Sequence, residues 1–516
     1  MHTPNPAISR RRFLTISSAA FLSLPLIGSR AWGANNRVRI AIIGMGNRGT
    51  SLMHQFNALP NVEIAAICDP DPGRLNRGIR SLESYYIRKL PEASAPEGDE
   101  AALKKAQAAY ESEIEQIKTN VSRVEQYQDY RKLLERGDID AVAIASPNHW
   151  HTLHAIHAMQ AGKHVYVEKP VSHSIWEGQQ LVAAEKKYNR IACAGFQNRS
   201  DAAPTDGIRY AQEGHMGKIL SVHVACLNNR KSIGPVVNPP LTPPSEIDYN
   251  LWLGPAQDLP ITRKKFHYDW HWIWNTGNGD VGNQAPHEID LACWTLGDGP
   301  LPTKVQCFGG RNAWNDAGQT PNQLTVWYKQ AGIPVTIEVN NITLSPTVNA
   351  APTRNGIRVG VVIKCEGGEV RGGRGGMYAV AEDGKTKLQS FRGDGGGAHP
   401  LNFIEAIRSG DASKITSRLT DAEKSSAIAH LANLSYRSGQ RSNENAITQA
   451  TKGNSETQEI LQDQNKQLLA WGISKPEYSL GSQIEIDKNG QITGEGVKPE
   501  WIHTPGRGEF VVPTLA

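Results

Sequence analysis

Short, continuously apolar runs alternate with amphipathic stretches over the first part of the chain. The runs at residues 38–43, 62–68 and 141–145 are rich in Val, Ile and Ala, and similar runs follow at 164–167 and 191–194. The stretches between them, such as those up to about Leu59 and at 130–136 and 151–161, have helical spacing. Such strand–helix–strand spacing predicts an α/β domain over residues 37–198, with a parallel sheet and right-handed crossovers.

Residues 74–125 interrupt this alternation. They are charged and rich in Ala, with Tyr, Leu and Ile recurring at helical spacing. We interpret them as one or two helices inserted on the surface. We favour the interpretation that this insertion is solvated and has no function of its own.

Beyond Arg199 the pattern changes. Strand-like segments at 219–227, 303–308, 323–328, 333–339 and 360–366 alternate with Pro- and Gly-rich turns. They predict a second, α+β domain over 199–440 with an open, mostly antiparallel sheet and a helix at 421–438. Residues 441–516 are expected to be an extension with one helix at 448–467 and an irregular tail. A chain of 516 residues is too long for one core, which agrees with two domains.

The amino-terminal residues 1–34 resemble a twin-arginine signal peptide. Ser9-Arg10-Arg11-Arg12-Phe13-Leu14 precedes an apolar run at 16–27, and small residues at 31–34 offer a cleavage site. The run is shorter than the roughly 20 residues that a membrane-spanning helix needs, so we predict no membrane span. We expect export to the periplasm by the twin-arginine pathway, which carries folded proteins; a disordered basic tail is the alternative.

The charge balance and the cysteines exclude several classes of protein. The formal net charge of +4 comes from the arginines of residues 1–34, and without that segment it is 0. A neutral protein lacks the basic surface that nucleic acids attract, so no nucleic-acid partner is expected. The six cysteines are widely spaced and form no C-x-x-C pair, so we predict no metal site.

A glycine-rich turn, Gly44-Met45-Gly46-Asn47-Arg48-Gly49, follows the first predicted strand and opens the first helix. Its glycines allow a tight turn, a close approach of a pyrophosphate and close helix–strand packing. Asp69 ends the second strand, 20 residues beyond Gly49, where it would bind the ribose hydroxyls. The pattern predicts NAD, with NADP possible; a purely structural turn is the alternative.

Two polar clusters follow the next strands, at the sheet edge where open α/β sheets bind ligands. The first is Ser146-Pro147-Asn148-His149-Trp150-His151, and the second is Glu168-Lys169-Pro170. Lys169 would point towards the nicotinamide and donate a hydrogen bond to a substrate oxygen. A helix cap and a surface lysine are the alternatives.

A third cluster lies in the second domain, where a glycine-rich loop at 275–282 leads into a helix that continues through Trp294. Asn283, His287 and Asp290 would share one helix face. Histidine suits proton transfer in alcohol oxidation near neutral pH, although Asn283 as a cap with a buried His287 is equally compatible. The aromatic segment 266–274 could stack on carbohydrate or simply fill a core.

Together these motifs resemble the Gfo/Idh/MocA oxidoreductases, which include glucose–fructose oxidoreductase and inositol dehydrogenase. The resemblance runs from about Arg37 to at least Gly297, and more loosely through 399–403 and 421–438. It implies a Rossmann domain followed by a domain whose open sheet supports substrate and oligomer contacts, and hence a homo-oligomer.

The resemblance also implies roles for single residues. Lys169 would assist catalysis, and His287 would act as acid and base on the sugar hydroxyl. Family members usually carry Asp four residues before this histidine, where this chain has Asn283, so Asp280 or Asp290 would have to supply the charge. Residues expected near the nicotinamide or the substrate are Gln197, Asn198, Arg199 and Asp280.

The expected function is hydride transfer between a sugar, glycoside or polyol hydroxyl and a tightly bound NAD. One alternative is an NAD-dependent glycoside hydrolase that works by transient oxidation and elimination. The glycosidase branch carries a His-Gly pattern where this chain has Pro286-His287-Glu288, which argues against it. The other alternative is a cofactor-binding protein without turnover.

Overall fold

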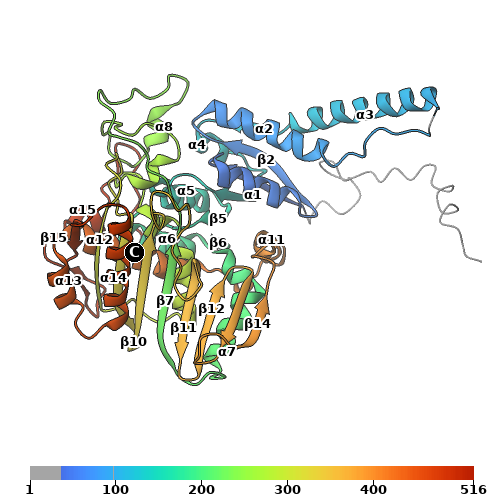
Figure 1. Ribbon diagram of the computed structural model, residues 1–516. Coiled ribbons are helices and arrows are strands. Elements are labelled where there is room, and N and C mark those ends of the chain that lie inside the picture. Colours follow the sequence, from blue (N-terminus) through green and yellow to red (C-terminus); the bar gives the residue numbers. More distant parts are fainter. Residues whose placement is uncertain (1–36, 97) are drawn as a thin grey trace, which may run out of the picture.

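The computed structural model describes residues 37–96 and 98–516, so the predicted signal segment 1–34 lies outside the described residues. A parallel sheet and a larger mixed sheet form two domains (Figure 1). Among the residues described, no helix is both long and apolar enough to cross a membrane.

The first domain is a six-stranded parallel sheet in the order β3-β2-β1-β4-β5-β6, which confirms the predicted Rossmann topology. Its strands are short, and all but the edge strand β3 are mostly buried because helices cover both faces. The strands are β1 (Val38–Ile43), β2 (Val62–Cys68), β3 (Glu125–Tyr127), β4 (Ala141–Ile144), β5 (His164–Glu168) and β6 (Ala192–Gly195). The helices are α1 (Asn47–Asn57), α4 (Tyr130–Leu134), α5 (Asn148–Gln160) and α6 (Ile175–Tyr188).

The inserted segment contains two helices, α2 (Pro72–Ile87) and α3 (Glu100–Val121). Helix α3 projects away from the body of the protein (Figure 1). Asp99 caps it by accepting a hydrogen bond from the Ala102 N–H. In its last turns the side chains of Ile117 and Val121 are buried.

The second domain is built on a 12-stranded mixed sheet in which β7 (Ile219–Leu227) runs parallel to β10 (Ile333–Asn340) and the other pairs are antiparallel. This confirms the predicted α+β domain. Its other main strands are β8 (Lys304–Gly310), β9 (Gln323–Gln330), β11 (Val359–Cys365), β12 (Gly368–Gly373), β13 (Gly376–Val380) and β14 (Lys387–Arg392). Its helices are α7 (Ala202–Gln212), α8 (Tyr249–Leu253), α9 (Gly279–Asn283), α10 (Pro286–Thr295), α11 (His399–Ser409) and α12 (Leu419–Ser438).

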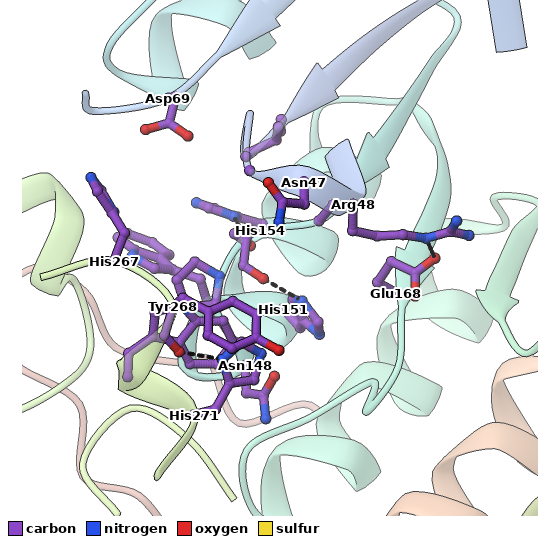
Figure 2. Close-up of a pocket in the computed structure, with 18 of the residues that line it drawn as sticks. Asn47, Arg48, Asp69, Asn148, His151, His154, Glu168, His267, Tyr268 and His271 are labelled. Carbon is purple, nitrogen blue, oxygen red and sulfur yellow. Dashed lines mark hydrogen bonds and ion pairs between the residues drawn. The ribbon is translucent and has the colours of Figure 1, made fainter. Parts of the chain in front are cut away.

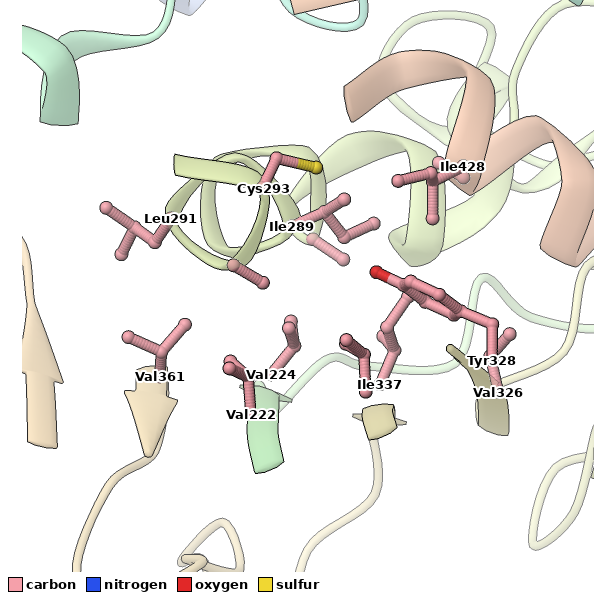
Figure 3. Close-up of a cluster of buried hydrophobic side chains, with 14 of the residues drawn as sticks. Val222, Val224, Ile289, Leu291, Cys293, Val326, Tyr328, Ile337, Val361 and Ile428 are labelled. Atoms are coloured by element: carbon pink, nitrogen blue, oxygen red, sulfur yellow. The ribbon is translucent and has the colours of Figure 1, made fainter. Parts of the chain in front are cut away.

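Helix α10 lies across one face of this sheet and is fixed there by apolar packing (Figure 3). Ile289 and Leu291 are fully buried against strand residues such as Val224 and Ile337. Burying a side chain of this size is worth about 1.5–3 kcal/mol. The helix that carries His287 is therefore anchored to the core of the second domain.

The carboxyl-terminal residues differ from the irregular tail expected from the sequence. Strands β15 (Gln440–Ser442), β16 (Tyr478–Leu480), β17 (Ile484–Ile486) and β18 (Ile492–Thr493) extend the sheet beyond β8. They are too short for a period-two pattern to be visible in the sequence. Helices α13 (Glu444–Ala450), α14 (Ser455–Ala470) and α15 (Pro499–Ile502) accompany them, and α14 packs on β9 and β10.

The second half of the chain also completes the core of the first domain. Phe403 of α11 packs with Phe56 and Tyr166, and Leu419 of α12 joins the core on the other face. Phe510 lies edge-on against Trp150, with ring centroids 5.3 Å apart. The two domains therefore share buried surfaces contributed by distant parts of the chain.

Candidate active site

A cavity of about 520 Å³ is lined by residues of both domains (Figure 2). It brings together the glycine turn, Asp69, the carboxyl ends of β4 and β5, the start of α10 and the aromatic segment 266–274. The predicted site residues that line it are Gly44, Gly46, Asn47, Arg48, Asp69, Ser146, Pro147, Asn148, His151, Glu168, Lys169, Gln197, Asn283 and His287.

The geometry of the glycine turn requires two of its glycines. Gly44 has φ +91°, and a Cβ there would lie 2.5 Å from the Ser146 nitrogen. A Cβ on Gly49 would lie 1.8 Å from the Gly44 carbonyl oxygen. Among the described residues no side chain caps the start of α1, so its first N–H groups remain available to an anion. Met45 and Gly49 shape this turn without lining the cavity.

Asp69 follows β2 and is held by the backbone. Its Oδ2 accepts a hydrogen bond from the Met45 N–H at 2.8 Å, and its Oδ1 accepts one from the Asp71 N–H at 3.0 Å. Burial raises the pKa of Asp69 to about 6, against the opposing charge of Arg74. The carboxylate is thus ionised at neutral pH and fixed in orientation at the cavity wall, as ribose binding requires.

The residues after β4 form a rigid wall. The two ring nitrogens of His151 lie 2.6 Å from the Pro170 carbonyl oxygen and 2.7 Å from that of Ser146. This side chain therefore joins the end of β4 to the segment that carries Lys169. Asn148 donates a hydrogen bond from Nδ2 to the Asn278 Oδ1 at 3.0 Å, which ties the wall to the second domain.

Glu168 ends β5 and Lys169 follows it, and their surroundings affect the ionisation of the two side chains differently. Burial opposes ionisation of Glu168, but Arg48, whose Nε lies 2.6 Å from its Oε1, and the Lys169 charge outweigh it and lower its pKa. Gln197 also donates to Glu168, at 3.2 Å. Burial lowers the pKa of Lys169, and Glu168 offsets this only in part. Lys169 is thereby made a better proton donor than an exposed lysine.

His287 lies at the start of α10, directly beside the cavity. Its side chain is buried, and its Nδ1 has no hydrogen-bond partner among residues 37–96 and 98–516. Burial lowers its pKa well below the usual value, and the charges of Arg374 and Lys169 add to this. The imidazole is therefore neutral at pH 7 and has an unused nitrogen.

The helix expected to carry Asn283, His287 and Asp290 on one face is divided in two. Helix α9 ends at Asn283, and α10 begins at Pro286, which cannot donate the backbone hydrogen bond of a continuous helix. Asn283 and His287 still reach the same cavity, whereas Asp290 does not.

The roles expected for Asp290 and Arg199 need correction. Arg199 is buried, and its guanidinium binds both carboxylate oxygens of Asp290 at 2.8 Å and also binds Asp298. A buried, bidentate ion pair is a structural feature, and neither partner lines the cavity. Asp290 cannot supply charge to His287 while it is neutralised by Arg199.

Asp280 also lies outside the cavity wall but remains connected to it. Its carboxylate is fully buried and binds Arg230 at 2.9 and 3.0 Å. Asn283 donates a hydrogen bond from Nδ2 to the Asp280 Oδ1 at 3.1 Å. Of the two aspartates considered, Asp280 is the one linked to the site, through Asn283, and it does not contact the substrate side directly.

Several residues of the cavity were missed by the sequence analysis, among them Arg374 and Gln284. Arg374, in the β12–β13 turn, donates to Gln197 Oε1 at 3.1 Å and to Asn198 Oδ1 at 3.2 Å. Asn198 in turn donates to the His287 carbonyl oxygen at 3.1 Å, so it positions this segment rather than lining the cavity. Gln284 lines the cavity beside His287. A lone arginine in the glycine-rich segment 367–376 carries no signal of this kind in the sequence.

The aromatic segment 266–274 covers one side of the cavity (Figure 2). Tyr268, Trp270 and His271 line it, and the Trp270 and His271 rings stack with centroids 3.6 Å apart. His267 Nε2 lies 2.9 Å from Asp71 Oδ2, so the segment bridges to the first domain beside Asp69. No group of three or more potential metal ligands was found within the described residues.

Two family models match the chain. The model for the oxidoreductase family, NAD-binding Rossmann fold, matches residues 86–196, and the model for the C-terminal alpha/beta domain of the same family matches residues 222–345. The first match lies within the first domain and begins after β2, and the second lies within the second domain and ends after β10.

A curated relative is the glycosyl hydrolase family 109 protein of Saccharopolyspora erythraea, 32% identical over 253 residues, which are 49% of this chain and 43% of the relative. The match thus spans less than half of the relative's length. Two solved structures share the fold at a TM-score of 0.51. A putative NADPH-dependent oxidoreductase of Desulfitobacterium hafniense is 14% identical, covering 78% of this chain and 96% of that one. The aldose–aldose oxidoreductase of Caulobacter crescentus is 16% identical, covering 77% and 96%.

The matched models, the parallel sheet with its glycine turn, and the second domain that adds His287 to the same cavity agree with one another. The two domains of the chain thus carry matches to both domain models of the Gfo/Idh/MocA oxidoreductase family, the NAD-binding Rossmann fold followed by the C-terminal α/β domain.

Proposed function

We propose that the protein is an NAD-dependent oxidoreductase that transfers a hydride between a sugar, glycoside or polyol hydroxyl and a tightly bound nicotinamide cofactor. The observation that carries this proposal is one cavity lined both by the residues for a dinucleotide and by Lys169 and His287. A site for binding alone would not need a neutral imidazole and a lysine of lowered pKa in the same cavity.

The residues present fit the cofactor. The turn at Gly44 and Gly49 leaves no room for a Cβ, and the uncapped start of α1 offers N–H groups to a pyrophosphate. Asp69 offers fixed carboxylate oxygens to ribose hydroxyls, and its charge disfavours the 2′-phosphate of NADP. When bound, the nicotinamide supplies the group that accepts or donates the hydride.

Lys169 and His287 would handle the proton. The neutral imidazole of His287, which lines the cavity, can accept a hydroxyl proton. Lys169 can donate a hydrogen bond to the same substrate oxygen and stabilise negative charge on it. Asn283 cannot take a proton, but its bond to Asp280 fixes its amide beside His287.

The bridge between His267 and Asp71 supports a cofactor that is retained. It lies beside Asp69, so the second domain closes over that part of the cavity. Retention would also suit the proposed export by the twin-arginine pathway, because an exported enzyme meets little free NAD. We further propose that the protein forms a homo-oligomer, as the family resemblance implies.

The test is His287→Ala in purified protein assayed with a panel of sugars and polyols. The wild type should accumulate NADH absorbance with at least one of them, and His287→Ala should not, while both contain the same amount of bound nucleotide. His215→Ala, an exposed histidine outside the cavity, is the matched control. Undiminished reduction in His287→Ala would overturn the role of His287.

The likeness to the glycosyl hydrolase family 109 protein favours a second candidate. In such an enzyme the glycine turn and Asp69 would hold an NAD that serves as a transient hydride acceptor, and the net reaction would be hydrolysis of a glycoside. The absence of the His-Gly pattern at Pro286-His287-Glu288 argues against it. Release of 4-nitrophenol from aryl glycosides without net NADH formation would establish it in place of the dehydrogenase.

A further inference from the structure

A second cavity, of about 280 Å³, is lined in part by the loop residues Trp274, Asn275 and Asn278. The described residues that line it all differ from those of the first cavity. It is enclosed by the start of α6, the segment 255–259, the carboxyl-terminal half of α12 and residues 500–505. Ligand sites of proteins typically occupy about 300–1,000 Å³, so this cavity suits a ligand of one ring.

Arg437 of α12 is the central feature of this cavity. Its guanidinium lies 5.0 Å from the ring centroid of Trp274 and 4.2 Å from that of Trp501. In the described part of the chain it makes no hydrogen bond and has no carboxylate within 4.0 Å. Burial lowers the pKa of Arg437 to about 10, against the opposing charge of the exposed Glu500. The cation is therefore held by two indole faces and lacks an anionic partner.

The histidines of the inner wall add no charge to the cavity, and Glu177 adds only part of one. Burial lowers the pKa of His149, His173 and His430 to between about 3 and about 4, so these imidazoles are neutral. Burial raises the pKa of Glu177 to about 7, so this carboxyl group is only partly ionised at neutral pH. Among the described residues that line the cavity, Arg437 is the cationic side chain, and Glu500 opposes its charge from farther than 4.0 Å.

The wall also contains an unmatched hydrogen-bond acceptor. Asn433 is 5% exposed and donates from Nδ2 to the Asn278 carbonyl oxygen at 2.9 Å. Its Oδ1 is buried and has no donor among the described residues. A ligand that carries hydroxyl groups would supply one. The indoles of Trp274 and Trp501 line the cavity beside Arg437 and add apolar surface that a sugar ring can contact.

We propose that this cavity binds an acidic monosaccharide, with its carboxylate on Arg437, its ring against Trp501 or Trp274, and its hydroxyls towards Asn433. A carboxylate gives Arg437 the bidentate partner that it lacks. The site adjoins the dinucleotide cavity without overlapping it, since Asn278 contributes to its wall and holds Asn148 by a hydrogen bond at 3.0 Å. This proposal does not depend on the reaction catalysed in the first cavity.

The test is a calorimetric titration of the purified protein, which retains its bound nucleotide. D-glucuronate and D-glucose are the two ligands titrated into it. Glucuronate should bind at least tenfold more tightly than glucose. Arg437→Gln should weaken glucuronate binding at least tenfold, whereas Arg441→Gln should not. Arg441 is the matched control because it lies just beyond the same helix, is exposed and is outside the cavity. Lys169→Ala should leave glucuronate binding unchanged, which separates the two cavities.

Three outcomes would overturn the proposal. These are glucuronate binding no tighter than glucose, unchanged binding in Arg437→Gln, and loss of binding in Lys169→Ala. Tighter binding of 4-hydroxybenzoate than of glucuronate would overturn the choice of a sugar ring. The melting temperature and nucleotide content show whether Arg437→Gln folds. If it does not, the proposal is tested by the affinities of the wild type for the two sugars and by Trp501→Leu, which should weaken glucuronate binding.

Discussion

Glu288 follows His287 in α10, and its carboxyl group should make the stability of the protein depend on pH. The residue is 3% exposed, its Oε1 accepts a hydrogen bond from Gln284 Nε2 at 3.1 Å, and its Oε2 has no partner in the described residues. Burial raises the pKa of Glu288 from 4.5 to about 8, although Gln284, Arg374 and Lys169 oppose the shift. The group is therefore protonated in the folded protein at neutral pH.

The raised pKa of Glu288 couples the free energy of unfolding to pH. Between pH 4.5 and about 8 the folded state holds a proton that the unfolded state has lost, so stability falls as the pH rises. Each pKa unit corresponds to 1.36 kcal/mol, which gives about 5 kcal/mol over the whole interval. Above about pH 8 both states are ionised and no further loss from this group is expected.

Glu288→Gln should remove this dependence, because a neutral amide of the same shape does not titrate. We expect the free energy of unfolding of Glu288→Gln, relative to wild type, to rise by about 5 kcal/mol between pH 4.5 and pH 8. Urea unfolding at pH 4.5, 6, 7 and 8 measures it, and Glu92→Gln, at an exposed position, is the control. A difference between variant and wild type that stays constant with pH would refute the buried, protonated state of Glu288.

Three further outcomes are expected. Gly49→Ala should abolish nucleotide retention, measured by mass spectrometry of denatured protein, because its Cβ would lie 1.8 Å from the Gly44 carbonyl oxygen. Asp69→Ser should weaken NAD and strengthen NADP in competition binding, since it removes the charge that repels a 2′-phosphate; an unchanged preference would contradict this role of Asp69. Asp290→Asn should lower the free energy of unfolding by about 1.5–3 kcal/mol in urea, because it removes one of the two carboxylates that bind the buried Arg199. A fully stable Asp290→Asn with lost activity would restore the catalytic role first expected for Asp290.

The sequence predicted the first domain well because its signals are local. The glycine turn, the acid at the end of β2 and the continuous apolar strands each depend on neighbouring residues. Lys169 and His287 could be placed in one site because the ends of parallel strands meet at one edge and a resemblance supplied the second domain. These residues do line the same cavity in the structure.

Long-range pairing is what the sequence could not reveal. The residue that neutralises Asp290 is Arg199, far away along the chain, so helical spacing alone made Asp290 look available to His287. The contact of Arg374 with Gln197 could not be predicted for the same reason, because Arg374 lies in a turn between two strands that is distant in sequence. The break between α9 and α10 was missed because Asn283 and Pro286 are both compatible with the first turn of one helix.

The contribution of the second half of the chain to the first domain has a consequence for biosynthesis. The parallel sheet is complete at Gly195, but Phe403, Leu419 and Phe510 cover its faces only after they have been synthesised. Phe510 lies about 300 residues later, which at 5–20 residues per second is a delay of roughly 15 to 60 s. During this interval apolar surface beside the nucleotide site stays open, and NAD can enter before the tail docks. The parallel sheet therefore acquires its complete core only after the strands of both domains have been synthesised.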